Sequence, residues 1–415
     1  MGRRTIIFEE QTTVGGKAQN YYENGLAFYL GPLLVDNASY PETMKIVNAV
    51  DVPVRSSVST STWMFNWTTG ETWAAPSSEL SASQFAEEVQ RYRLYWESDY
   101  EPFARSLYTN SVPEALTVST SEWFSTRDYP ILQSRITRLL ISWGYGDANE
   151  VPILYTLGVF SPYSLGGYPG LVVFERYSQQ LTTATIHLGS KILSIDRPGD
   201  NVTIHYGFHP QSEQSRGGLS LQTCSDVIMA FPPTTRALQH AGLELSSDES
   251  TVFSAVETSN YFAGAIRLNI PPMSSFKVAS ISPTVSADIA GEPVLAQGMY
   301  SNSSVSITYS LAASGQHTNQ VKKIALETLS RINTDPQEAG EIPIPVTLAD
   351  IEDFRHYPGY FPHFNLTRLQ EGWYEKFTSL QGSDRTYYTS GLNRVEHVEF
   401  VIQAARDLVE GHFAP

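Results

Sequence analysis

The sequence predicts an α/β fold, and the prediction depends on two stretches at opposite ends of the chain. Near the start, Thr5–Phe8 is an apolar, β-branched strand, and Gly15-Gly16-Lys17 follows soon after it. Near the end, a short strand over Arg385–Thr389, a turn at Gly391 and a helix from about Glu396 succeed one another. A strand that enters a helix through a glycine turn leaves free backbone N–H groups at the positive helix end. Such a turn receives an anion or an electron-rich carbonyl oxygen.

The C-terminal helix has strong support from the spacing of its apolar residues. They recur every three or four positions, which is the pattern of a helix that buries one face. These positions are Val398, Val401, Ile402, Ala405, Leu408 and Val409.

The first half of the chain predicts a β-hairpin and then a helical block. Residues 54–75 are rich in aromatic and β-branched residues around a Thr-Thr-Gly turn, which is typical of a hairpin. Residues 81–110 predict a long helix, and further helices follow over 113–147. Aromatic residues at helical spacing pack a core more often than they touch a cofactor, so we interpret those of the long helix as core. They are Phe85, Tyr92, Tyr95, Trp96, Tyr100, Phe103 and Tyr108.

The second half alternates strands with helices. Residues 184–208 alternate apolar and polar side chains around a Pro-Gly-Asp-Asn turn, which predicts a hairpin. The stretch CSDVIMAFPP predicts one strand that ends at Pro232. Residues 250–310 predict strands, and helices are predicted over Val321–Ile332 and after Asn365, which is a suitable N-cap.

Composition limits the partners of this folded chain of 415 residues. Its net charge of −16 argues against nucleic acid and an anionic membrane surface as partners. No apolar run is long enough to span a bilayer. The single cysteine, Cys224, excludes an internal disulfide and a cysteine-rich metal site. We therefore expect a small-molecule substrate, while the sequence leaves the oligomeric state and the compartment open.

Glu9 and the glycine pair after it suggest a dinucleotide. In a dinucleotide-binding fold, an acidic residue at the end of the second strand accepts hydrogen bonds from a ribose diol. Glycine residues close behind it let the backbone approach the cofactor. His205 and His209 have a spacing that could suit a metal, but no cluster of further ligands accompanies them, so we predict no metal site.

Four blocks in this order carry a resemblance that spans nearly the whole chain. They are FEEQTTVGGK, HLGSKILSIDR, CSDVIMAFPP, and the C-terminal HYPGYFPHF with LQGSDRTYYTSGLNRVEHVEF. Together they resemble the flavin-containing amine oxidases, and within these the fungal FAD enzymes similar to β-cyclopiazonate dehydrogenase. The resemblance implies FAD as cofactor and an amine-oxidase-like fold, in which an FAD-binding, Rossmann-like domain is interleaved with an α+β substrate domain.

The resemblance also implies the domain boundaries. The FAD domain would take residues 1–70, 171–240 and 351–415, and the substrate or cap domain residues 71–170 and 241–350. In that family a strand and a G-x-G-x-x-G turn precede the block FEEQ, and this sequence contains no such turn. We therefore expect an N-terminally truncated FAD domain that lacks this strand and the phosphate-binding turn.

The resemblance assigns cofactor contacts residue by residue. Glu9 would hold the adenosine ribose, and Ile192 would contact the adenine through its backbone. Val398 would offer its N–H to the N1/C2 edge of the flavin, where reduction accumulates negative charge. The remaining predicted contacts, to the phosphates, the ribityl chain and the flavin ring, are Gly15, Gly16, Lys17, Gly31 and Gly391.

Amine oxidases flank the substrate with two tyrosines, and the resemblance gives candidates for both positions. Tyr357 or Tyr360 would supply one, and the other position holds His397 in this chain. The family's lysine near the flavin N5 has no counterpart in residues 295–310. Both departures favour a dehydrogenase, desaturase or isomerase over a simple O2-dependent amine oxidase.

Three functional hypotheses follow. The first is an FAD-dependent oxidoreductase of secondary metabolism that oxidises an amine-containing or apolar small metabolite by hydride transfer to flavin. The second is a flavin-dependent isomerase that moves double bonds in polyunsaturated fatty acids. The third is a non-catalytic remnant that keeps the scaffold and cannot hold FAD.

Overall fold

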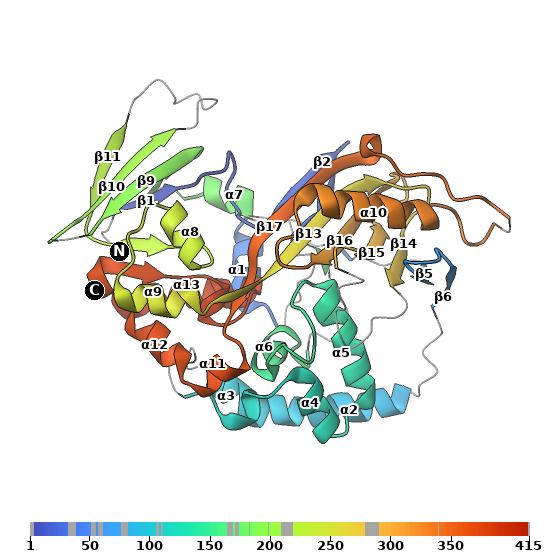
Figure 1. The fold of residues 1–415 in the computed structure, drawn as a ribbon, viewed down its shortest axis with the longest axis horizontal. Helices are drawn as coiled ribbons and strands as arrows, with labels where there is room; N and C mark the ends of the chain where they lie inside the picture. The colour runs from blue at the N-terminus through green and yellow to red at the C-terminus, as the bar shows by residue number, and fades with distance from the viewer. Residues whose placement is uncertain are drawn as a thin grey trace.

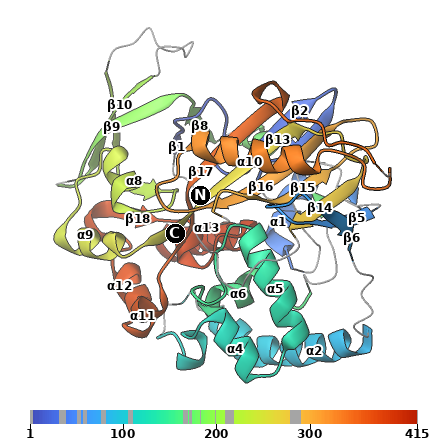
Figure 2. The same ribbon diagram turned by 45° about the vertical axis from the view of Figure 1, so that its right-hand side comes forward.

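The fold was described from a computed structural model of the chain. It describes residues 4–31, 39–50, 55–56, 61–75, 82–104, 108, 111–163, 169–170, 174–181, 183–197, 199–208, 219–278, 290–338 and 340–413. The architecture is mixed α/β, as predicted, and Figures 1 and 2 show helices arranged around several sheets. None of the described helices is both long and apolar enough to cross a membrane.

The largest sheet in the described part of the chain has seven strands in the order β17-β13-β16-β15-β14-β5-β6. All neighbours in it are antiparallel except β14 and β5, which run parallel. Its strands are β5 (Ser61–Phe65), β6 (Thr72–Ala74), β13 (Glu257–Arg267), β14 (Ser274–Val278), β15 (Pro293–Gly298), β16 (Val305–Ala312) and β17 (Ile351–His363).

Helices cover both faces of this sheet. On one face, Phe262 of β13 packs with Val321 of α10 (Thr318–Ile332). The next residue back, Tyr261, donates its hydroxyl to the backbone carbonyl of Ser142, at the end of α5 (Pro130–Ser142). Because successive strand residues point to opposite faces, α10 and α5 lie on opposite sides of the sheet (Figure 1).

Two short parallel pairs join segments that are far apart in the sequence. β1 (Thr5–Phe8) pairs with β8 (Ala184–His187), and β12 (Val227–Met229) pairs with β18 (Thr386–Tyr388). The predicted hairpin forms β9 (Ser190–Asp196) and β10 (Val202–Phe208), which β11 (Ser220–Cys224) extends to three strands. The N-terminal, middle and C-terminal segments of the predicted FAD domain therefore meet, while the exact domain boundaries stay a prediction.

The other described elements are short. The strands are β2 (Asn20–Glu23), β3 (Leu26–Tyr29), β4 (Arg55–Ser56) and β7 (Pro169–Gly170), and the 3-10 turns are Glu114–Leu116, Leu348–Asp350, Ser383–Arg385 and Gly391–Asn393. The helices are α1 (Pro41–Ala49), α2 (Ala82–Tyr95), α3 (Glu101–Ala104), α4 (Thr120–Thr126), α6 (Ile153–Val159), α7 (Phe174–Gln179), α8 (Thr235–His240), α9 (Ser247–Ser254), α11 (Leu366–Gln370), α12 (Trp373–Ser379) and α13 (Val398–His412).

The aromatic residues of the long helix are core, as predicted. The helix runs from α2 through a π-helical turn at Trp96–Tyr100 into α3. Tyr92 is fully buried and donates its hydroxyl to the carbonyl of Phe160, while the Trp96 indole donates to the carbonyl of Leu157. Hydrogen bonds to backbone carbonyls satisfy the polar tips of these rings, so they can fill the interior.

Two predicted elements differ from the structure. CSDVIMAFPP is not one strand, because Ser225 and Asp226 separate β11 from β12 and each strand joins a different sheet. The C-terminal helix begins at Val398. Of its predicted apolar face, Leu408 is buried and the other residues are only partly buried, while Glu399 and Ala404 are buried although they were not predicted. Much of the predicted hairpin before residue 61 lies outside the described residues.

Candidate functional site

The site is built around the segment that connects β18 to α13. Ser390 closes the turn, because its hydroxyl accepts from the backbone N–H of Leu392 and its own N–H donates to Asn393 Oδ1. A Cβ on Gly391 would lie 2.9 Å from Glu396 Oε2 and 3.0 Å from its Cα. Gly391 is therefore needed for the close approach of the turn to Glu396, whatever it contacts beyond the protein.

Three buried polar atoms in this segment have no hydrogen-bond partner within the described part of the chain. They are Thr389 Oγ1, Arg394 Nε and His397 Nδ1, all within nine residues of one another. Buried polar atoms are nearly always paired, and each exception calls for a water, ion or ligand. The segment that the resemblance assigns to the flavin and its phosphates thus holds donors and acceptors that such a polar cofactor fits.

The start of α13 offers backbone donors as well. His397 occupies the N-cap position, and no side chain caps the helix. The N–H groups at the N-terminus of a helix are unpaired and lie at the positive end of its dipole. Val398 is the first residue of the helix, so its N–H is among these donors, and its contact to the flavin stays a prediction.

His397 itself is a neutral aromatic residue at neutral pH. Its ring centroid lies 4.6 Å from that of Tyr40 and 5.1 Å from that of Phe400. Burial lowers the pKa of His397 to about 4, because an imidazolium among these rings would lose its hydration. It can therefore offer a lone pair or an N–H at this position, but not a positive charge.

Lys17 links the N-terminal glycine turn to this segment. Its Nζ lies 2.8 Å from Glu396 Oε2 and donates to the carbonyl of Gly359 at 3.1 Å. The turn that places it uses Gly15 and Gly16, both with positive φ (117° and 54°). The ion pair neutralises Glu396, so the start of α13 keeps its electropositive character.

Of the two candidate tyrosines, Tyr360 lies beside this ion pair. Its ring centroid is 5.3 Å from Lys17 Nζ, while the Tyr357 hydroxyl donates to the carbonyl of Leu30 at 2.8 Å. Gly359 has φ of 68°, and the pairing of β13 with β17 shifts register between Ser259 and Tyr261. This bulge turns Tyr360 away from the regular alternation and towards the ion pair.

Tyr145 completes the group, and sequence reasoning missed it. Its hydroxyl donates to the carbonyl of Glu396 at 2.6 Å, and its ring centroid lies 6.0 Å from that of Tyr360. Burial raises the pKa of both tyrosines far above the usual value, so both stay neutral. The available signal was the sequence Gly-Tyr-Gly: Gly144 and Gly146 have φ of 81° and 121°, which ends α5 and presents the tyrosine between them.

The other predicted contacts lie nearby in two groups. Gly31 packs against the glycine turn, because a Cβ on it would lie 2.1 Å from the Lys17 carbonyl oxygen. Glu9 is at the end of β1, where its carboxylate accepts from the backbone N–H of Gln11 and burial raises its pKa. Its carbonyl accepts from Ser190, which brings Glu9 beside β9 and Ile192. The roles of these residues at a cofactor stay predictions.

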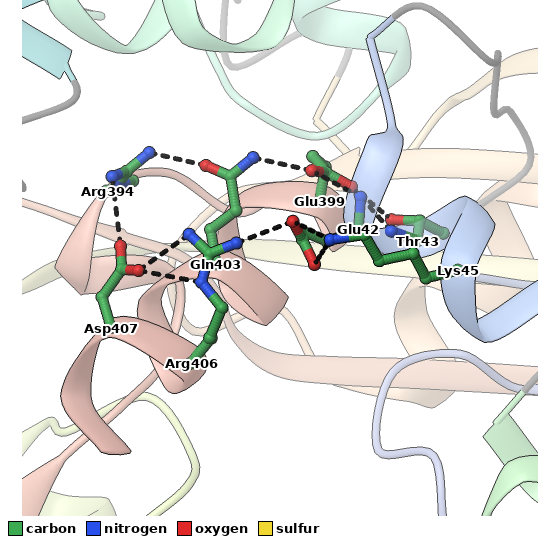
Figure 3. Close-up of polar contacts among 8 residues, drawn as sticks. All are labelled: Glu42, Thr43, Lys45, Arg394, Glu399, Gln403, Arg406 and Asp407. Atoms are coloured by element: carbon green, nitrogen blue, oxygen red, sulfur yellow. Dashed lines mark hydrogen bonds and ion pairs between the residues drawn. The ribbon is translucent and has the colours of Figure 1, made fainter. Parts of the chain in front are cut away.

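A buried polar network holds α13 against α1 (Figure 3). Glu399, which is 1 % exposed, accepts from the backbone N–H groups of Glu42 and Thr43 and from the Thr43 hydroxyl, at 2.8–3.1 Å. Gln403 donates to Glu399 and accepts from Arg394. The network therefore connects the N-terminus of α1 with the arginine whose Nε is unpaired.

The described residues contain no metal-binding cluster. No group of three or more histidine, cysteine, aspartate and glutamate side chains comes together there. His205 Nε2 lies 3.1 Å from Asp196 at the surface, while His209 is outside the described residues. Cys224 is half-buried, and burial raises the pKa of its thiol, which disfavours a reactive thiolate.

Sequence comparison identifies a viral relative of the chain. No protein-family profile matches the chain. The uncharacterised protein R656 of Acanthamoeba polyphaga mimivirus is 26 % identical over 319 residues, which cover 69 % of this chain and 60 % of that protein. The matched region thus spans less than two thirds of the viral protein.

Solved structures share the fold over nearly the whole chain. A fatty acid isomerase from P. acnes that produces CLA superposes with a TM-score of 0.80 at 17 % identity, over 99 % of this chain and 92 % of the isomerase. Cyclohexylamine oxidase from Brevibacterium oxydans superposes with a TM-score of 0.59 at 12 % identity, over 97 % and 93 %. The chain therefore shares an amine-oxidase-like fold with these enzymes. The finer resemblance to the fungal enzymes stays a prediction.

Proposed function

We propose that this chain is an FAD-dependent oxidoreductase that takes a hydride from an apolar or amine-containing small molecule. The observation that carries the proposal is the set of three unpaired buried atoms on Thr389, Arg394 and His397, directly before the uncapped N-terminus of α13. The turn at Ser390 and Asn393 forms its hydrogen bonds within the protein. We infer that the three unpaired atoms instead form hydrogen bonds to a ligand.

FAD, when bound, supplies the redox chemistry of the reaction. The N–H of Val398 and the dipole of α13 would stabilise negative charge that develops at the flavin N1/C2 edge. Lys17 holds Glu396 and thereby the start of α13 in place. Tyr360, Tyr145 and His397 would enclose the substrate with neutral aromatic surfaces, which exclude water and suit an apolar carbon centre.

The visible absorption spectrum of the purified chain after incubation with FAD and gel filtration tests the proposal. The same measurement on the chain preceded by a strand and a G-x-G-x-x-G turn tests whether those elements are required for binding. Flavin bands in either protein, lost or weakened in the Arg394→Met variant, are the expected result. If both proteins stay colourless, the oxidoreductase proposal fails and the remnant hypothesis replaces it.

A second candidate function is isomerisation of a double bond in a fatty acid, a reaction without net oxidation or reduction of the substrate. The observation that favours it is the TM-score of 0.80 with the fatty acid isomerase, against 0.59–0.61 for the oxidases. Product mass distinguishes the two functions. An oxidised product lacks two hydrogens and needs an electron acceptor, whereas an isomer keeps its mass and forms without one.

A further inference from the structure

The outer strand of the three-stranded sheet has an open edge. The strand order β11-β10-β9 places β11 (Ser220–Cys224) at one side of this sheet, and β10 is the strand it pairs with in the described part of the chain. Figure 1 shows β11 outermost, at the upper left edge of the molecule. Alternate residues of an antiparallel edge strand direct their N–H and C=O groups away from the sheet. β11 therefore offers backbone donors and acceptors to a further strand.

β11 faces the interior with one side and solvent with the other. Val202 of β10 is buried directly opposite Cys224, so the even-numbered residues of β11 lie on the inner face. Leu221 lies on the outer face and is 59 % exposed, while Leu219, just before the strand, is 80 % exposed. Single exposed leucines are common on protein surfaces. Here, however, two of them adjoin the same open edge.

Other edges of the larger sheets carry features that hinder pairing between molecules. β17, at one edge of the seven-stranded sheet, contains Glu352, Arg355 and Pro358. β6, at the opposite edge, has only three residues, and β9 contains a lysine and an aspartate. Charges, prolines and short strands are the usual protection of a sheet edge. The sequence Ser-Leu-Gln-Thr-Cys of β11 has no charge and no proline over five residues.

Charge and symmetry determine which partner fits this edge. Two copies of a chain with a net charge of −16 repel each other, and the same charge disfavours nucleic acid and anionic lipid. β11 itself is neutral, so two copies can meet along it without placing like charges in contact. An antiparallel edge is also self-complementary, because a two-fold rotation pairs the strand with its own copy and satisfies both sets of backbone groups.

We propose that two copies of this chain pair through β11 to form an antiparallel, two-fold dimer in which their three-stranded sheets become one. The register that covers both exposed leucines centres the axis on Leu221. Leu221 then lies opposite Leu221 of the partner subunit, and Leu219 lies opposite Thr223 of the partner subunit. One short strand covers less surface than the roughly 800 Å² per partner of a stable interface, so the dimer dissociates on dilution. The dimer does not require FAD and is independent of the proposed function.

Sedimentation velocity of the purified full chain, from about 1 µM to about 500 µM, tests the proposal. We expect the mass to rise from monomer to dimer and to stop there, because the two-fold contact uses the open edge of both copies. Leu221→Lys should weaken association about ten-fold or more, because it places two positive charges opposite each other at the axis. Raising the salt concentration should strengthen the parent dimer, since screening reduces the repulsion between the two acidic chains.

Leu94→Lys is the matched control. Leu94 of α2 is 58 % exposed, and α2 lies at the bottom of the view in Figure 1, away from β11. This variant adds the same charge at an equally exposed leucine and should leave association unchanged. Both side chains point to solvent, so both variants should keep the far-UV circular dichroism of the parent.

A disulfide test locates the axis. In a Cys224→Ser background, Leu221→Cys should form an intermolecular disulfide under mild oxidation, because directly opposite residues have Cα atoms about 4.5–5.5 Å apart. Leu193→Cys, at an exposed position of β9, should stay reduced. Equal cross-linking of the two variants would overturn the pairing through β11.

The mass measurements give further ways to refute the dimer. A chain that stays monomeric over this range, or a dimer that is as tight in Leu221→Lys as in the parent, overturns the proposal. Equal weakening by Leu94→Lys would mean that added positive charge, and not the edge of β11, controls association. Weakening by salt would show that ion pairs hold the copies together, and a mass beyond the dimer would contradict a closed two-fold contact.

Discussion

Lys17 and Glu396 are 379 residues apart in the sequence, and the Lys17 Nζ lies 2.8 Å from Glu396 Oε2. The same ammonium group donates to the carbonyl of Gly359. One side chain therefore joins the N-terminal glycine turn, the bulge of β17 and the start of α13. Lys17 therefore fixes both C-terminal segments of the candidate site to the N-terminal segment.

Lys17→Met should destabilise the protein by about 1–3 kcal/mol, because it leaves the mostly buried Glu396 carboxylate without its partner. Chemical denaturation of Lys17→Met, Glu396→Gln and the double variant would measure this. We expect the double variant to lose less than the sum of the single losses, since neither group is then left unpaired. Lys45→Met is the control: the Lys45 side chain is 71 % exposed, and its pair with Glu42 should contribute less than about 1 kcal/mol. If the loss in the double variant equals the sum of the two single losses, the Lys17–Glu396 contact contributes nothing to stability.

Sequence patterns were sufficient to predict the local helices and strands, including those on either side of Gly391. The strand before Gly391, the turn and the helix after it follow from local propensity and apolar spacing, and the structure has all three. The aromatic core of α2 follows in the same way. These features depend on residues within a few turns of one another, which is the range over which periodicity carries information.

The long-range contacts of the site could not be predicted in this way. Nothing local indicates that Glu396 pairs with Lys17, or that Tyr145 reaches the Glu396 carbonyl. The first residues of α1 and α5 are another example. Both helices follow a Tyr-Pro pair without a capping side chain, and the distant carboxylates of Glu399 and Glu88 accept from their N–H groups instead. Tertiary structure decides these partners.

Gly144→Ala should destabilise the protein by more than the strain of its positive φ alone would. A Cβ at Gly144 would lie 2.5 Å from the Tyr261 ring, and its φ of 81° strains any other residue. We expect a loss of about 3 kcal/mol or more in unfolding free energy, since strain and displacement of a buried ring add. Gly315→Ala is a matched control, because Gly315 has φ of 84° and no atom lies within 4 Å of the position that its Cβ would take. It should lose only about 1 kcal/mol. Equal losses would mean that the contact with Tyr261 is unimportant.

Glu399→Ala should destabilise the protein by about 2–4 kcal/mol, because it removes an acceptor from two backbone N–H groups, the Thr43 hydroxyl and Gln403 (Figure 3). Thr43→Val removes only the hydroxyl and should cost about 1 kcal/mol. Thermal unfolding of both variants would show which of them loses more stability. Glu410→Ala, at an exposed position of the same helix, is the control and should change stability by less than about 0.5 kcal/mol. A Glu399→Ala variant as stable as this control would contradict the capping role.

His397→Phe should make stability less dependent on pH between 6.5 and 4. Burial lowers the pKa of His397 from 6.5 to about 4, so the folded protein binds this proton less readily than the unfolded chain. The resulting stability is fully present above pH 6.5 and falls as the pH drops towards 4, by roughly 2–3 kcal/mol for a shift of this size. Phenylalanine keeps the packing against Tyr40 and Phe400 and does not titrate. Urea unfolding at a series of pH values would measure the slope.

Part of the slope should remain in His397→Phe, because burial also lowers the pKa values of His363 and His356. If the unfolding free energy of His397→Phe depends on pH as that of the parent does, His397 is hydrated in the folded protein. In that case its ring would not be the neutral, water-excluded surface on which the proposed site depends.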